Sequence, residues 1–306
     1  MNDKNMILLK KTIIITMLIA ACFAATFIQI KMPTGDMIHL GNFVMIMAAL
    51  LLGGIAGGLV GSLGMGIYDL IFYTSKPSTI IRTFILKFLI GFIVGAVFRL
   101  ILKKKLNTNH LLIGAATFFG VLFTVTFILF FVGDRSNLSF NTGLTSTIRN
   151  IFGSEKSFKI SLFIPIFSFI FGLGMTFAII FGRKLSNRSK AALFAITVAI
   201  LVNILGEFLL RWTLEGIFNV AVGGLNVSDA FNTSIVVATS KIPGSLITGF
   251  ITVFLAALVY EPVYLGVKNL SVFKDDTKEF DANEDVETNN DNNNIKLDNT
   301  KLTHNN

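Results

Sequence analysis

The chain alternates between long apolar runs and short segments of polar or basic residues. A helix needs about 20 mainly apolar residues to cross the hydrocarbon core of a bilayer. On this criterion we predict eight membrane spans, with Gly53-Gly54 joining the short second span tightly to the third. The predicted spans are 12–31, 42–53, 55–73, 82–102, 110–132, 160–182, 191–212 and 242–267. The pattern indicates an all-α fold, a polytopic membrane helix bundle.

The composition agrees with a protein that is embedded in the lipid bilayer. Apolar residues make up 53% of the chain and charged residues only 14%, whereas soluble domains carry about 25% charged residues. The single cysteine excludes an internal disulfide framework and a multi-cysteine metal site. The sequence also lacks the motifs of phosphate-binding loops, zinc proteases and serine elbows. We therefore expect no enzyme activity, no catalytic residues, no metal and no cofactor.

The basic residues predict the orientation of the chain in the membrane. They gather before the first span and in the segments after the fourth, sixth and last spans. These clusters are Lys10 and Lys11; Lys103, Lys104 and Lys105; Arg183, Lys184, Arg188 and Lys190; and Lys268, Lys274 and Lys278. With eight crossings all four clusters share one side, which the positive-inside rule assigns to the cytoplasm. We expect a multi-pass cell-membrane protein with both termini cytoplasmic and, despite a net charge of +8, no nucleic-acid partner.

A few polar residues interrupt the apolar spans. A charged side chain within a span costs a few kcal/mol, so each one needs a reason. The predicted topology brings Asp69, Lys87 and Glu207 near the extracellular face, the last two about 8 Å below the outer ends of their spans. A shared depth beneath the polar loop 35–43 indicates a site for a small polar ligand that enters from outside. The predicted substrate-binding residues are His39, Asn42, Asp69, Lys87, Asn203, Glu207, Trp212, Ser245 and Thr248.

Several of these residues have a simpler interpretation. Lys87 could pair with Asp69 or Glu207 only to neutralise charge, or it could extend to the outer interface. Arg211 and Trp212 are expected at the interface, where Trp commonly anchors a helix. Stacking of Trp212 on a flat ligand is the alternative for that residue.

Small residues recur at four-residue spacing in two of the predicted spans. The stretch "GGIAGGLVGSLG" places Gly53, Gly57 and Gly61 on one face of the third span, where they allow close helix packing. The stretch "AACFAA" repeats alanine in two registers of the first span, with members Ala20, Ala21, Ala24 and Ala25. Packing within the protein and docking to another membrane subunit both explain the alanine pattern.

The stretches "KMPTGDMIHLGNFVMIMAALLLGGIAGGLVGSLGMGIYDLIF" and "PSTIIRTFILKFLIGFIVG" resemble the S components of energy-coupling-factor (ECF) vitamin transporters, in particular the riboflavin-type branch. The matching positions are Lys31, Pro33, His39, Leu40, Gly41, Asp69, Lys87 and Gly91. The later stretches "LVNILGEFLLRWTLEG" and "KIPGSLITGFITVFLAALVY" resemble the last two helices of that family. The resemblance covers about 12–105 and 189–267.

This resemblance implies a substrate-binding membrane subunit that captures a vitamin or related micronutrient from the extracellular side. The loop after the first helix is expected to close over the site. The subunit would then dock on a transmembrane T component that is carried by two ATPase subunits, and it would tip in the membrane to release its substrate inside. Ala20, Ala21, Ala24 and Ala25 are the residues that the resemblance assigns to docking on the T component.

The chain departs from the family pattern in three places. Asn42 replaces an aspartate, Ser245 and Thr248 replace Asn and Gln, and residues 110–182 add a helical hairpin to the usual six spans. We therefore divide the chain into 1–105 and 189–268 as the two halves of the membrane core, 106–188 as an inserted hairpin, and 269–306 as a disordered cytoplasmic tail rich in Asn and acidic residues. The identity of the substrate stays open.

A different function is compatible with the same polar residues. A stand-alone secondary transporter could couple Asp69, Lys87 and Glu207 to protons or sodium ions. Such transporters commonly contain broken helices in matched halves of an inverted repeat, and the sequence shows no clear pair of this kind. Co-purification with a T component would separate the two interpretations.

Overall fold

A computed structural model of the protein describes residues 3–31, 37–133, 166, 168–170, 172–173, 176 and 186–270. Most of the predicted sixth span, most of the predicted tail and the loop residues Pro33 and Asp36 lie outside these residues. The elements are α1 (Asp3–Thr26), β1 (Gln29–Lys31), β2 (Met37–His39), α2 (Gly41–Leu52), α3 (Gly54–Phe72), α4 (Pro77–Lys103), α5 (Thr108–Gly133), α8 (Asn187–Ala221), α9 (Val227–Ser240) and α10 (Ile242–Val267). The predicted all-α membrane bundle is confirmed, with one short β-hairpin as its only sheet in the described residues.

Within the described residues, six helical segments are long and apolar enough to cross a bilayer. They are α1, α3, α4, α5, α8 and the run from α9 through α10. The short helix α2, predicted as the second span, has 12 residues. At a rise of 1.5 Å per residue it is about 18 Å long, which is too short for a hydrocarbon core of about 30 Å. It packs inside the bundle instead, and most of its residues are buried.

Several helices end at other residues than the apolar pattern predicts. Helix α1 stops at Thr26 because the chain then enters a hairpin, in which Gln29 of β1 faces His39 of β2. Helix α8 continues nine residues past Trp212, to Ala221. It is followed by α9, which the sequence analysis missed because its Ser, Thr and Asn residues dilute the apolar signal. The last predicted span coincides with α10.

Glycines allow α2, α3 and α4 to pack with their backbones close together. A Cβ atom at Gly91 of α4 would overlap the backbone of Gly57, and one at Gly95 would overlap that of Gly54. Gly53 joins α2 to α3 with φ = +98°, and any side chain there would meet the guanidinium group of Arg99. The prediction that the small residues of the third span serve close packing is confirmed. The close packing of these helices fixes the position of the residues at the end of α3.

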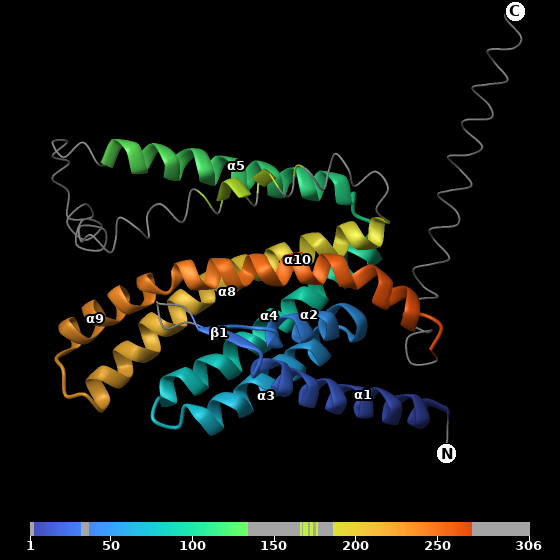
Figure 1. Cartoon of the computed structure of the whole chain (residues 1–306), viewed down its shortest axis with the longest axis horizontal. Helices are drawn as coiled ribbons and strands as arrows, with labels where there is room; N and C mark the ends of the chain where they lie inside the picture. Colours follow the sequence, from blue (N-terminus) through green and yellow to red (C-terminus); the bar gives the residue numbers. More distant parts are fainter. Residues whose placement is uncertain are drawn as a thin grey trace, which may run out of the picture.

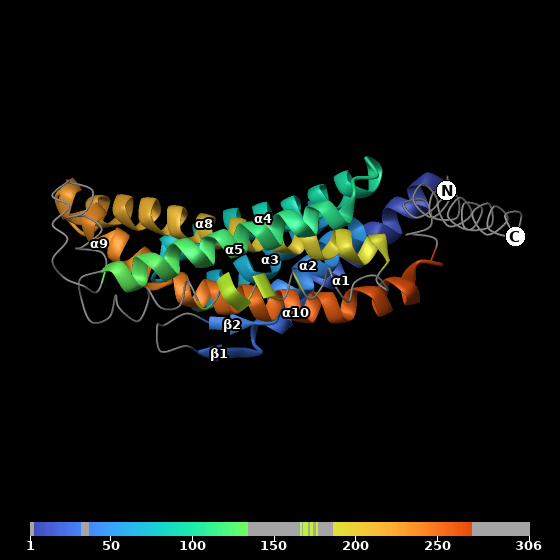
Figure 2. The ribbon, with the colours of Figure 1, turned by 90° about the horizontal axis from the view of Figure 1, so that it is seen from above.

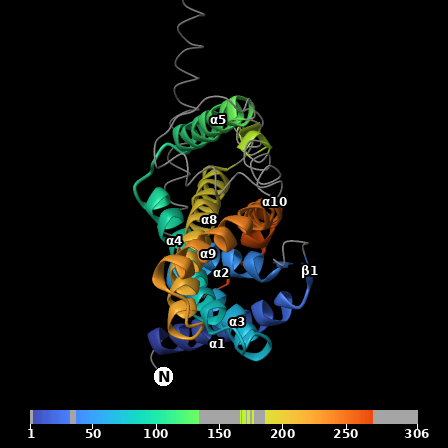
Figure 3. The same ribbon diagram turned by 90° about the vertical axis from the view of Figure 1, so that its left-hand side faces the viewer.

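The main apolar core lies between α1, α2, α3, α4, α8 and α10, and it contains large buried side chains such as Phe98, Met65 and Tyr260. Helix α5 lies outside this core, along α8 (Figures 1 and 3). It is attached through a second, smaller cluster in which Leu112 and Phe119 meet Ile200 and Leu246. The first helix of the predicted inserted hairpin is therefore an addition to the side of the bundle.

The two ends of the bundle differ in charge and in construction. The start of α1, the end of α4, the start of α8 and the end of α10 lie at one end (Figure 1). The described members of the predicted basic clusters lie on these segments, namely Lys10, Lys11, Lys103, Lys104, Lys105, Arg188, Lys190 and Lys268. The turn between α3 and α4 and the connection between α8 and α9 lie at the other end (Figure 1). The β-hairpin lies beside α10, at the edge of the bundle (Figure 2).

Candidate substrate-binding site

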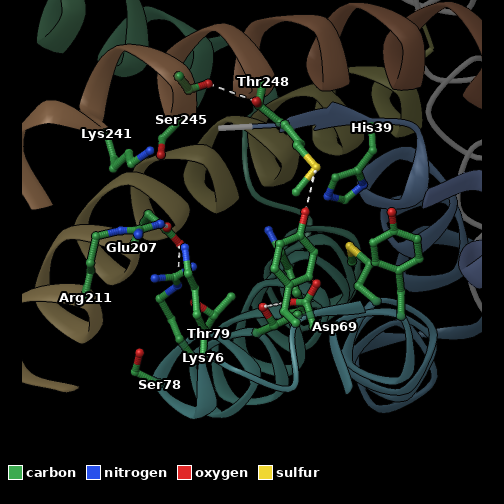
Figure 4. A pocket seen from close by; sticks show the side chains of 18 of the residues that line it. His39, Asp69, Lys76, Ser78, Thr79, Glu207, Arg211, Lys241, Ser245 and Thr248 are labelled. Atoms are coloured by element: carbon green, nitrogen blue, oxygen red, sulfur yellow. Dashed lines mark hydrogen bonds and ion pairs between the residues drawn. The ribbon is translucent and has the colours of Figure 1, made fainter. Parts of the chain in front are cut away.

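A cavity of about 480 Å³ lies between the β-hairpin, the end of α3, the start of α4, and helices α8, α9 and α10. Small-molecule sites commonly have volumes of about 300–1,000 Å³. The lining is rich in charged and hydrogen-bonding side chains from segments far apart in the sequence (Figure 4). Such a lining suits a small polar molecule.

The first polar contacts join α3, α4 and α8 across the cavity. Thr83 of α4 donates a hydrogen bond to the Asp69 carboxylate of α3, with 2.5 Å between Oγ1 and Oδ2. Lys87 of α4 donates to the side-chain oxygen of Asn203 on α8, at 3.4 Å. These contacts differ from the sequence-based alternative in which Lys87 pairs with Asp69 or Glu207. The long Lys87 contact leaves its ammonium group with further donor capacity toward the cavity.

A second group of contacts is a network of ion pairs between α4 and α8. Glu207 lies 3.3 Å from Arg82 Nε and 2.5 Å from Arg211 Nη2. Glu215 lies 3.1 Å from Arg211 Nη1 and 3.8 Å from Arg82 Nη1. Glu207, Arg211 and Glu215 follow one another at intervals of four residues, so they share one face of α8. The two arginines and two glutamates balance one another, which allows four charges to remain inside an apolar bundle.

Arg82 has donor capacity that this network does not use. Its side chain is only 8% exposed. Within the described residues, its Nη1 atom has no hydrogen-bond partner. The distance of 3.8 Å to Glu215 is beyond the usual range of a hydrogen bond. A buried donor without a partner costs about 1–3 kcal/mol, so this atom indicates a missing acceptor in the cavity.

The β-hairpin and the start of α2 contribute further unmet hydrogen-bonding groups. Gln29 Oε1, His39 Nδ1 and Asn42 Oδ1 are buried and lack a hydrogen-bond partner in the described part of the chain. All three residues line the cavity. Burial lowers the pKa of His39 to about 3, and the nearby charge of Lys87 adds to this effect, so the imidazole is neutral at neutral pH. The Gln29 and Asn42 oxygens call for hydrogen-bond donors on a bound molecule.

The cavity brings together eight of the nine predicted substrate-binding residues. Those that line it are His39, Asn42, Asp69, Lys87, Asn203, Glu207, Ser245 and Thr248. Trp212 is not among the lining residues, and its ring packs edge-on against Phe231 of α9, with 6.1 Å between centroids. Arg211, which was expected at the interface, is buried in the ion-pair network instead. Thr248 uses its hydroxyl to donate to the Gly244 carbonyl.

Lys87 and Glu207 lie farther from the ends of their helices than the 8 Å that was predicted from the ends of their apolar runs. Helix α4 begins at Pro77, so Lys87 lies ten residues, or about 15 Å, along it. Glu207 lies 14 residues, or about 21 Å, before the end of α8. Both values exceed 8 Å because the helices extend beyond their apolar runs.

Sequence reasoning missed several lining residues. Arg82 and Glu215 lie near the predicted ends of spans. Charged residues are common at such positions and do not by themselves indicate a site. The four-residue spacing of Glu207, Arg211 and Glu215 was a signal that could have identified the ionic face of α8. Gln29 was predicted to lie in the first span, so its position in a β-hairpin that lines the cavity was missed.

The alanines that were predicted to dock a partner lie on the outside of α1. Ala20, Ala21 and Ala24 are exposed, and Ala25 is partly buried. The opposite side of the helix carries buried Cys22, which packs against Gly64 of α3. Packing within the described protein therefore leaves the alanine face uncovered.

The fold and the cavity define a class, that of multi-pass membrane proteins with a polar cavity inside one end of a helix bundle. Residues 6–154 match the family model described as "ECF-type riboflavin transporter, S component". Over these residues, which are just under half of the chain, the protein is similar to this family, as the motifs between Lys31 and Gly91 indicated. The family consists of transporter subunits and is not an enzyme family.

The match includes almost all of α1 and every element from β1 to α5, whereas α8, α9 and α10 lie beyond it. The ion-pair network therefore joins a helix inside the matched segment to one outside it. No curated protein and no solved structure matches the chain.

Proposed function

We propose that the protein is the substrate-binding S subunit of an ECF-type importer and that it captures a small vitamin-like molecule, with a flavin as the first candidate. The observation that carries this proposal is the set of buried polar atoms without hydrogen-bond partners around one cavity, inside a chain whose residues 6–154 match the S-component family model. A protein that leaves such atoms unpaired gives up stability, and a ligand that pairs them recovers it.

The capture step follows from the position of the hairpin. The strands β1 and β2 connect α1 to α2 and place Gln29 and His39 against the cavity. A ligand that enters at this end would accept hydrogen bonds from Lys87 and donate them to Gln29 and Asn42. By the predicted topology this end faces the outside of the cell, with both termini in the cytoplasm.

Uptake requires energy that this subunit does not supply. We propose that a T component with two ATPase subunits docks on the exposed alanine face of α1. Small residues permit close approach of a second helix in the membrane. A double variant, Ala20→Leu with Ala24→Leu, should retain ligand binding but lose uptake and co-purification with the T component. Normal uptake by this variant would remove the docking role from the alanine face.

The first experiment is a thermal-stability screen of the detergent-purified protein against riboflavin, other B vitamins and their precursors. A ligand at a thousandfold excess over its Kd stabilises the folded state by about 4 kcal/mol. A clear shift with one compound would identify the substrate and support the binding subunit. If no compound shifts the folded protein, the proposal fails, and ion-coupled uptake into vesicles that lack a T component becomes the next measurement.

A further inference from the structure

The sequence continues past the last described residue, Leu270, with a segment whose charge is opposite to that of the chain as a whole. Residues 275–291 contain eight acidic residues and one lysine, which gives this acidic segment a net charge of −7. The whole chain has a net charge of +8. Blocks of like charge of this kind repel themselves and are often interaction tails. The acidic segment therefore calls for a basic partner.

A basic surface lies at the end of α4. Lys103, Lys104 and Lys105 are consecutive and exposed, and we call these three residues the lysine patch. An acidic residue at the same end of the bundle, Glu261 of α10, is already hydrogen-bonded to two serines of the α8 segment. Its carboxylate is therefore engaged away from the patch, and the positive charge of the patch remains exposed.

The chain leaves the bundle beside the lysine patch. Phe98 of α4 and Tyr260 of α10 are in edge-to-face contact, with 5.8 Å between ring centroids. From this contact both helices run to the same end of the bundle (Figure 1). At a rise of 1.5 Å per residue, Lys103 lies about 7.5 Å beyond Phe98, and Lys268 lies about 12 Å beyond Tyr260. The end of α10 and the lysine patch are therefore neighbours.

The acidic segment is close enough to reach the patch. Asp275 follows Lys268 by seven residues, which span at most about 25 Å when fully extended. Because the segment is covalently attached to α10, its effective concentration at the patch is on the order of the millimolar values that short linkers give. A single exposed ion pair contributes little to binding. Several are available here, since eight carboxylates face a patch of three lysines.

We infer that the acidic segment 275–291 binds to the lysine patch within the same chain. The contact covers part of the basic end of the bundle and holds the segment beside the ends of α4 and α10. It also shields the patch from anionic lipid head groups, which attract clusters of lysines at a membrane surface. This inference is independent of the ligand that the cavity binds.

The first test is cross-linking of the full chain in an uncharged detergent with a carbodiimide, which joins carboxylates to lysine amines without a spacer. Mass spectrometry of the monomer band should find links between the acidic segment and the lysine patch. Their yield should fall at least about fivefold between 0.1 M and 1 M salt, because the Debye length falls from about 10 Å to about 3 Å. Lys76, which is exposed beside the start of α4, is the internal control and should form no such link.

The second test measures how the lysines affect the position of the segment. Nitroxide labels are placed on Asn107→Cys, next to the patch, and on Asn290→Cys in the acidic segment, while Cys22→Ala removes the native cysteine. Double electron–electron resonance then gives the distance distribution between the labels. The distribution should broaden and shift to longer distances when all three patch lysines are replaced by glutamine. It should stay unchanged in Lys76→Gln, the matched control.

Four outcomes would overturn the inference. They are absence of the links, links that are equally frequent at Lys76, links that occur only in a dimer band, and a distance distribution that does not respond to the lysine substitutions. The distance measurement is then repeated in bilayer nanodiscs that contain phosphatidylglycerol. A distribution like that in detergent supports the contact at a membrane surface. A shift to the distances of the glutamine variant would show that lipid head groups occupy the patch instead, and would also overturn the inference.

Discussion

The two ends of the bundle both contain polar clusters, but these clusters differ in how many of their buried hydrogen-bonding groups have partners. At the end with the basic loops, Glu261 accepts hydrogen bonds from Ser186 and Ser189. Arg188 donates to the Tyr260 hydroxyl at 3.1 Å, and its guanidinium carbon lies 3.9 Å from the centre of the Tyr264 ring. At the cavity end, donors and acceptors on four separate elements are buried without hydrogen-bond partners in the described chain.

We interpret this difference as the difference between a structural cluster and a candidate binding site. Buried polar groups in native proteins are nearly always paired, and a group of unpaired ones needs an explanation. The contacts around Glu261 join the start of α8 to α10, and the groups in them bond to one another. The groups around the cavity include buried atoms that lack a hydrogen-bond partner in the described chain and that face the same cavity. Four experiments test whether the comparison holds, beginning with the largest expected effect.

Glu207→Gln should cause the largest loss of stability. The substitution leaves Arg82 and Arg211 buried with one carboxylate between them, and removal of one partner from a buried ion pair costs about 3–5 kcal/mol. Thermal unfolding in detergent measures the loss. Glu261→Gln at the opposite end is the control and should lose less, because the glutamine can still accept from Ser186 and Ser189. Equal losses at both ends would show that Glu207 is no more critical than an ordinary polar contact.

Asp69→Asn and Lys87→Met should weaken ligand binding while the protein still folds. Hydrogen bonds to charged groups contribute about 1.5–3 kcal/mol, so affinity should fall by about 10- to 100-fold. Titration with the ligand found in the stability screen measures the change. The membrane-inserted yield of each variant is compared with that of the unmodified protein. If either variant fails to insert into the membrane, its residue has a structural role, and the prediction that it binds the ligand is contradicted.

His39 should make the stability depend on pH. Its pKa is lowered to about 3 by burial, whereas an exposed histidine has a pKa of about 6.5. Below pH 6.5 the unfolded chain therefore binds a proton that the folded protein does not. The free energy of unfolding should fall by up to about 1.4 kcal/mol for each pH unit between pH 6.5 and 5. This loss should be absent in His39→Gln and retained in His110→Gln, an exposed control. A slope that is the same in all three proteins would contradict the buried, neutral state of His39.

Asn42→Ala and Ser189→Ala should have the smallest effects, and these should differ in kind. Asn42 Oδ1 has no partner in the described residues, so its removal should leave the unfolding midpoint of the empty protein unchanged or raise it. The Ser189 hydroxyl donates to Glu261, and its removal should lower the midpoint by the equivalent of about 1 kcal/mol. Only Asn42→Ala should weaken ligand binding. A loss of stability in Asn42→Ala that equals the loss in Ser189→Ala would end the distinction between the two clusters.

The sequence was sufficient to predict the membrane bundle and many of the residues that line the candidate site. A charged residue in an apolar run is conspicuous, which is why Asp69, Lys87 and Glu207 were found. The close approach of α3 and α4 followed from glycine spacing. Arg82 and Glu215 were missed because the ends of helices α4 and α8 extend past their apolar runs. Their pairing also joins residues more than a hundred positions apart, and single-sequence patterns contain no information on such contacts.

The balance of charge in the interior has a consequence for movement in an electric field. Six charged residues surround the buried part of the cavity, namely Asp69, Arg82, Lys87, Glu207, Arg211 and Glu215. Three are acidic and three basic, so together they carry no net charge. Moving one elementary charge through a membrane potential of 100 mV is worth about 2.3 kcal/mol. Displacement of this set as a whole along the membrane normal therefore does no net electrical work. The membrane voltage acts on the set only through the direction of its dipole.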